Sequence, residues 1–130
     1  MKKIILVCLF LGFLSCKSQE KKEAIVVDVN VEKFQQLISE KGVQLIDVRT
    51  PAEFNDGHIK NAKLINYMAA DFKEKAFEGL DKSKPVLVYC ASGGRSAKSA
   101  KIYKEAGFTK VYNLLGGFRA WSAEKLEIEK

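Results

Sequence analysis

The feature that most constrains the fold is a short apolar run, residues 86–89, that leads directly into Cys90 and a glycine-containing loop. The segment after the loop spaces its apolar residues as a helix does. A cysteine on such a strand-to-helix turn meets backbone N–H groups and the positive end of the helix, and both favour a thiolate over a thiol. The stretch therefore predicts a small anion-binding loop around a reactive Cys90 that solvent can reach.

The loop itself supplies the candidate binding groups. Gly93 and Gly94 tolerate backbone angles that turn the amides inward. The Ser92 hydroxyl is a further donor, and Arg95 either braces the loop or faces an anionic substrate. The structural alternative is a cysteine that only packs at the end of a buried strand. We expect Cys90 to be the nucleophile and the next residues to bind the anion, mainly through backbone amides: Ala91, Ser92, Gly93, Gly94 and Arg95.

Composition places the chain among compact single-domain proteins. Its 130 residues are 47% hydrophobic, which suits one core rather than two. The formal net charge of +6 rests on 22 basic residues, nearly all of them lysines scattered along the chain. Because the sequence has neither an arginine-rich run nor an aromatic-basic ladder, this charge predicts a solvated surface and no nucleic-acid partner.

Residues 1–15 are expected to be a targeting segment rather than part of the fold. Lys2 and Lys3 precede an apolar stretch, residues 4–14, which as a helix of roughly 16 Å is too short for a hydrocarbon core of about 30 Å. A small residue stands before Cys16. The pattern resembles a bacterial lipoprotein signal, although Phe13 stands where leucine is more usual. The resemblance implies a lipid on Cys16, a polar tether over 16–24, and a cell-envelope lipoprotein that faces the periplasm or the cell exterior.

The cysteine count adds to the argument for a reactive Cys90. Cys8 leaves with the signal and Cys16 carries the lipid, so Cys90 remains as the one thiol of the mature chain. In an oxidising compartment an unpaired cysteine is a liability unless its chemistry is used. The pattern therefore favours a chemical role for Cys90 over a packing role.

Strand and helix patterns alternate downstream of the tether. Asn30 and Thr50 are expected to cap the first two helices, and Glu53 completes a capping box with Thr50. A third helical segment is predicted over 72–80. This order predicts an α/β domain over 25–130 with a mostly parallel five-stranded sheet and helices on both faces. The predicted strands are 25–29, 43–48, 62–66, 86–89 and 111–114.

Five separated stretches resemble, in order, the signature segments of a single-domain rhodanese: residues 45–49, 53–54, 57–62, 90–96 and 115–121. Any one of them can occur by chance, but the five together span about residues 25–124. The resemblance implies a rhodanese-like three-layer sandwich. It also implies a sulfurtransferase that moves sulfane sulfur through a Cys90 persulfide, with no metal and no organic cofactor.

Under this resemblance, Cys90 takes sulfur from thiosulfate, a persulfide or a polysulfide and passes it to cyanide or to a thiol, such as that of a thioredoxin-like protein. The chain is expected to be a monomer. Ala91 stands where thiosulfate-active members often carry a basic residue, which predicts that thiosulfate is a poor donor. Four residues separate Cys90 from Arg95, whereas related cysteine phosphatases have five, so the tighter loop favours sulfur over phosphate. The alternative is a catalytically weak rhodanese-like module that serves a partner protein, either by only binding it or by carrying sulfur for it.

Polar residues outside the loop have both structural and functional interpretations. His58, the only histidine, is expected to make a structural hydrogen bond rather than to act as a base. Asp47 and Arg49 either tune the pocket or support the structure, and structural support is favoured. Arg49 and Glu53 are four residues apart and form a candidate ion pair.

Overall fold

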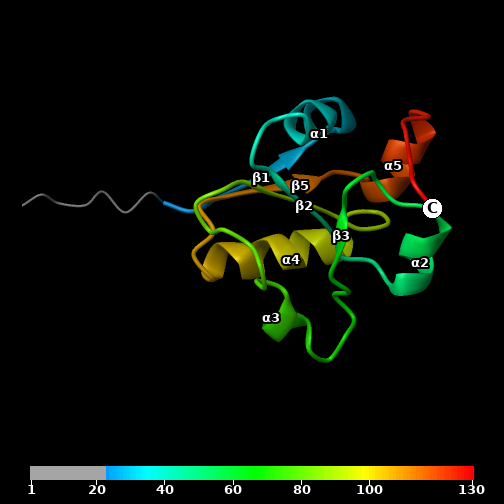
Figure 1. The fold of residues 1–130 in the computed structure, drawn as a ribbon. Helices are drawn as coiled ribbons and strands as arrows, with labels where there is room; N and C mark the ends of the chain where they lie inside the picture. The colour runs from blue at the N-terminus through cyan, green and yellow to red at the C-terminus, as the bar shows by residue number, and fades with distance from the viewer. Residues whose placement is uncertain (1–22) are drawn as a thin grey trace, which may run out of the picture.

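The computed structural model describes residues 23–130, so the predicted signal 1–15, the lipid site Cys16 and most of the tether 16–24 lie outside the described residues. The described chain forms one sheet of five parallel strands in the order β1-β5-β4-β2-β3 (Figure 1). The predicted parallel sheet is confirmed. Its strands are β1 (Ile25–Val29), β2 (Gln44–Asp47), β3 (Lys63–Leu64), β4 (Val86–Tyr89) and β5 (Lys110–Leu114).

Helices cover both faces of this sheet. α1 and α5 lie on one face, and α3 and α4 lie on the other (Figure 1). The short α2 lies at the end of the sheet, next to the C-terminal segment. The architecture is thus the expected α/β three-layer sandwich. The helices of the described chain are α1 (Val31–Ile38), α2 (Pro51–Asp56), α3 (Phe72–Lys75), α4 (Gly94–Glu105) and α5 (Gly117–Ala123).

The central strand β4 contributes to both layers of the core. Successive side chains of a strand point to opposite faces, so Val86 and Val88 pack toward α4, whereas Leu87 and Tyr89 pack toward α1 and α5. All four are fully buried, as a strand covered on both faces requires. Cys90 continues the alternation and points to the α4 face.

The first two helices begin where local chemistry predicts. The Asn30 side chain accepts a hydrogen bond from the Lys33 amide at 2.9 Å and caps α1. Thr50 and Glu53 form the predicted capping box at the start of α2, and Pro51 occupies its first turn. These caps determine where the chain leaves β1 and β2 and enters the following helix.

Two elements are much shorter than the sequence pattern predicts, and β2 is one residue shorter at each end than the predicted strand 43–48. The third helix is α3 alone, and the chain from Ala76 to Leu80 forms turns. Phe72 and Ala76 still anchor this segment in the core, and Gly79 takes a left-handed φ of 71° that stops further helix. Only two residues of the predicted strand 62–66 form β3, because β3 is an outermost strand of the sheet and pairs with β2 alone.

Parallel strands bring all their carboxyl ends to one edge of the sheet. Cys90 follows β4 at this edge, and Leu115 follows β5 there. The described chain enters the sheet at Ile25, which begins β1 at the opposite edge. Within residues 23–130, every helix is too short or too polar to cross a membrane.

Candidate active site

Cys90 begins the loop that leads from the central strand into α4. Its Sγ accepts a hydrogen bond from the Gly93 backbone N–H at 3.1 Å and one from the Ser96 hydroxyl at 3.4 Å. Burial raises the pKa of the Cys90 thiol, but these bonds, together with the Ser96 and Ser92 amides, lower it by more. The net pKa of Cys90 lies below that of an ordinary cysteine, so the loop favours a thiolate.

The expectation that solvent reaches this sulfur is wrong for the conformation described. Cys90 is 1% exposed and belongs to the apolar cluster beneath α4. Within the loop, Ser92 and Gly94 are the exposed residues, and Ala91 is partly exposed. A reactant therefore needs a displacement of the loop to reach Sγ.

The start of α5 packs directly against this loop. The amides of Phe118 and Arg119 donate hydrogen bonds to the carbonyl oxygens of Cys90, at 2.7 Å, and Ala91, at 3.0 Å. Gly117 permits the approach, because a Cβ there would lie 2.5 Å from the Cys90 carbonyl oxygen, and its φ of 57° is left-handed. The glycine-rich turn after β5 therefore acts by positioning the backbone of the Cys90 loop.

Arg95 braces the other side of the loop against α2. Its Nη1 and Nη2 lie 2.8 and 2.9 Å from the two carboxylate oxygens of Glu53. The Arg95 guanidinium, aided by hydrogen bonds from Thr50, lowers the pKa of Glu53 to about 2. The predicted ion pair between Arg49 and Glu53 is wrong, because the Glu53 carboxylate binds Arg95 from a distant part of the chain.

Arg49 instead pairs with Asp47, two residues before it. Its Nη2 lies 2.7 Å from Asp47 Oδ2 and 2.7 Å from the Gly57 carbonyl oxygen, and both charged side chains are almost fully buried. The guanidinium also lies over the Phe118 ring, 4.1 Å from its centroid. The pair thus links β2 to the end of α2 and to α5, which is the supporting role that the sequence favoured.

His58 makes the structural contacts expected of it. Its Nδ1 lies 2.9 Å from the Phe54 carbonyl oxygen, and its ring stacks on that of Phe54 with centroids 3.7 Å apart. Its backbone exchanges two hydrogen bonds with Glu129 in an isolated antiparallel bridge. His58 therefore fastens the C-terminal segment to the end of α2.

Sequence reasoning misses two important side chains. The hydroxyl that reaches the sulfur belongs to Ser96 and not to the exposed Ser92. Ser96 is fully buried in the first turn of α4, which begins at Gly94. A sequence prediction that began the helix at Gly94 rather than at residue 96 would have directed the Ser96 side chain toward the loop. Glu53 is missed as the partner of Arg95 because no short-range spacing in the sequence relates the two residues.

The arrangement suits a stabilised sulfur anion. A backbone N–H and a hydroxyl converge on Sγ, and the first turn of α4 begins beside it. Across the described residues 23–130, no three His, Cys, Asp or Glu side chains gather closely enough to hold a metal ion.

Known proteins are similar to this chain in sequence and in fold. The uncharacterized protein YqhL of Bacillus subtilis is 32% identical over 126 residues, which cover 95% of this chain and 96% of YqhL. Thiosulfate sulfurtransferase GlpE of Coxiella burnetii is 38% identical over 89 residues, which cover 68% of this chain and 79% of GlpE. The crystal structure of a rhodanese-related protein from Thermoplasma volcanium matches with a TM-score of 0.69 and 28% identity, over 79% of this chain and 97% of that one.

The family model described as the rhodanese-like domain matches residues 30–124. That range runs from the cap of α1 to the end of α5, and it contains the Cys90 loop with both of its braces. Since the family match, the relatives and the strand order all agree, the chain belongs to the rhodanese-like domain family.

Proposed function

We propose that this protein is a sulfurtransferase that carries sulfane sulfur as a Cys90 persulfide. The observation that supports this most directly is the convergence of the Gly93 amide and the Ser96 hydroxyl on Sγ. These donors stabilise negative charge on sulfur in a site with little water, where such bonds are strongest. The relatives named thiosulfate sulfurtransferase support the same reaction class.

The reaction proceeds in two displacements at sulfur. The Cys90 thiolate attacks the outer sulfur of the donor, a new S–S bond forms, and the old bond breaks with its electron pair on the leaving group. The leaving group is sulfite from thiosulfate, or a thiolate from a persulfide. An acceptor thiolate or cyanide then attacks the terminal sulfur of Cys90-S-S⁻ and regenerates the Cys90 thiolate. No net oxidation or reduction of the protein occurs.

The donor that fits this loop best is a persulfide or polysulfide rather than thiosulfate. Ala91 offers no charge next to the nucleophile. Arg95 has both terminal nitrogens bound to Glu53, so its charge is already neutralised by a carboxylate. A dianion such as thiosulfate thus gains little electrostatic attraction from the two positions best placed to supply it.

We further propose that the chain is a cell-envelope lipoprotein anchored through Cys16. The described domain begins at Ile25 on one edge of the sheet, whereas Cys90 lies at the opposite edge. An anchor joined to the first edge leaves the Cys90 edge available to soluble donors and to a thiol acceptor such as a thioredoxin-like protein. Palmitate labelling that disappears in Cys16→Ala tests the anchor separately from catalysis.

The test of the transfer reaction is to incubate the purified domain with a low-molecular-weight persulfide and to measure its mass. We expect a gain of one sulfur atom on Cys90, absent in Cys90→Ser, and its loss when cyanide or a thiol is added. Because the loop covers Cys90, loading is expected to be slower than for a free thiol, and brief mild warming accelerates it. Failure of every sulfane donor to load the protein would favour the alternative of a rhodanese-like module that only binds a partner protein. Hydrolysis of an aryl phosphate that depends on Cys90 would favour a phosphatase.

A further inference from the structure

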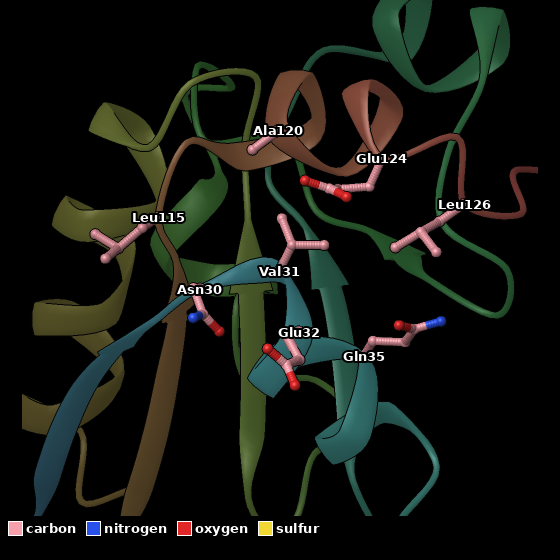
Figure 2. A pocket seen from close by; sticks show the side chains of 8 residues that line it. All are labelled: Asn30, Val31, Glu32, Gln35, Leu115, Ala120, Glu124 and Leu126. Atoms are coloured by element: carbon pink, nitrogen blue, oxygen red, sulfur yellow. The ribbon is translucent and has the colours of Figure 1, made fainter.

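A cavity of about 540 Å³ lies between α1 and α5 at the carboxyl edge of the sheet (Figure 2). Val31, Leu115 and Leu126 give it apolar walls. Glu32 from α1 and Glu124 at the end of α5 lie on opposite sides of Val31 in this view. A cavity of this volume can hold a few side chains and is larger than one small anion requires.

The cavity adjoins the Cys90 loop through shared structure. Leu115 lines the cavity and is 50% exposed, and it directly precedes Gly116. A Cβ on Gly93 of the loop would lie 3.7 Å from the Gly116 nitrogen. α5 makes the second link, since the helix that donates to the Cys90 carbonyl oxygen also places Ala120 in the cavity wall. A molecule seated in the cavity is therefore held next to the reacting loop.

The charge of the cavity selects against the sulfur donors. Both Glu32 and Glu124 are exposed, and neither has an ion-pair partner among residues 23–130. Glu124 stands at the C-terminal cap of α5, where the helix carbonyls add further negative charge and a carboxylate disfavours the helix. Thiosulfate and persulfides are anions, so this cavity repels them. The cavity instead attracts a cationic group that stands beside an apolar one.

We propose that this cavity docks the sulfur acceptor, a protein whose thiol-bearing loop carries a lysine or arginine next to an apolar side chain. The proposal rests on the proposed transfer function and adds a partner to it. The cationic side chain binds between Glu32 and Glu124, and the apolar one packs on Val31 and Leu115. Cys90 itself points to the α4 face, so the thiol of the docked loop reaches the persulfide across the carboxyl edge of the sheet once the Cys90 loop is displaced. The negative charge of the cavity thus excludes the anionic sulfur donors and favours the cationic acceptor.

The experiment uses two tetrapeptide acceptors, one with lysine, leucine, glycine and cysteine in that order and one with glutamate in place of lysine. Protein is first loaded and its persulfide verified by mass, and sulfur transfer to each peptide is then timed. With the native chain, we expect the lysine peptide to react about fivefold faster at low salt, with the ratio falling as salt rises. The ratio falls toward one in Glu32→Gln/Glu124→Gln.

The matched control is Glu40→Gln/Glu105→Gln, which removes two exposed glutamates away from the cavity and should leave the ratio unchanged. Transfer to cyanide should be the same in all three proteins. A native ratio near one, or a ratio that survives loss of Glu32 and Glu124, would overturn the proposal.

Binding is measured separately, so that failure of catalysis does not hide the result. S-methylated forms of the two peptides are titrated into unloaded protein, and amide NMR signals of Leu115 and Glu124 are followed. Preferential shifts with the lysine peptide support docking even if no persulfide ever forms. Stronger competition by a peptide of residues 17–22 would overturn the proposal in favour of the chain's own lysines, and dimerisation lost in the double variant would do so in favour of a second copy.

Discussion

Arg95 and Glu53 form a two-pronged ion pair that joins the first turn of α4 to the first turn of α2, with nitrogen–oxygen distances of 2.8 and 2.9 Å. Glu53 also completes the capping box with Thr50, so the same carboxylate caps the start of α2 and braces the loop that leads into α4. The geometry makes Arg95 a positioning residue for the Cys90 loop.

Replacing Arg95 by lysine should slow persulfide formation by about ten- to a hundredfold, because one ammonium cannot hold both carboxylate oxygens and the loop shifts. Glu53→Gln should slow it similarly, and the two changes together should cost little more than either alone. Stopped-flow loading with a persulfide donor measures this. If the variant instead needed more thiosulfate to reach an unchanged maximal loading rate, Arg95 would be shown to bind the donor.

The Glu53 carboxylate should make folding stability depend on pH at the acid end. Its pKa is lowered from 4.5 to about 2 in the folded protein, so the ion pair stabilises the fold above pH 4.5, and this contribution is lost as the pH falls toward 2. Urea unfolding of the native chain and Glu53→Gln across this range measures the difference. The stability gap between the two proteins should narrow as pH falls, and a gap that stays constant would contradict the assignment.

Ser96→Ala should raise the pKa of Cys90. The Ser96 hydroxyl donates to Sγ at 3.4 Å, and without it the buried thiolate keeps the cost of burial but has fewer donors. Thiolate absorbance in the ultraviolet, followed against pH, reports this without requiring a reagent to enter the loop. Ser92→Ala serves as the control, because the Ser92 side chain is exposed and its amide is retained. An equal shift in both variants would contradict the role of Ser96.

Gly117→Ala should destabilise the fold by about 1–3 kcal/mol, because the added methyl group overlaps the loop backbone. Its Cβ would lie 2.5 Å from the Cys90 carbonyl oxygen at a left-handed φ. Gly94→Ala is the matched control, since a Cβ there meets no atom within 4 Å. We expect Gly94→Ala to be neutral or to stabilise by up to about 1 kcal/mol in urea unfolding. Equal behaviour of the two variants would mean that the turn is not packed as described.

Asp47→Leu should cost about 3–5 kcal/mol of folding stability, because it leaves the Arg49 guanidinium buried without its carboxylate. Arg49 is only 3% exposed and Asp47 is fully buried. The double change Asp47→Leu/Arg49→Met removes both charges and should be less destabilised than the single change. Thermal unfolding of the three proteins measures the order. A double variant that unfolds at a lower temperature than Asp47→Leu would show that Arg49 stabilises the fold through Gly57 and Phe118 alone.

Much of this protein is determined by short-range patterns in its sequence. The run over β4, with both faces apolar, requires cover on both sides, and Asn30 and Thr50 stop the strands by capping helices. Strands that alternate with helices in this order admit few arrangements other than a parallel sheet. Such a sheet necessarily delivers Cys90 to the same edge as the other strand ends. Periodicity, caps and the glycine loop are all local, so the sequence alone determines the fold class and the place of Cys90 in it.

The tertiary structure alone decided which side chains meet around Cys90. Glu53 meets Arg95 rather than Arg49, because the fold brings together the first turns of α2 and α4, which no sequence spacing connects. The apolar cluster beneath α4 buries the thiol that the sequence pattern predicted to be accessible, and the first turn of α4 directs Ser96 rather than Ser92 toward the sulfur. Contacts between distant segments depend on the angles at which helices settle on the sheet, and those angles follow from the whole core rather than from any local pattern.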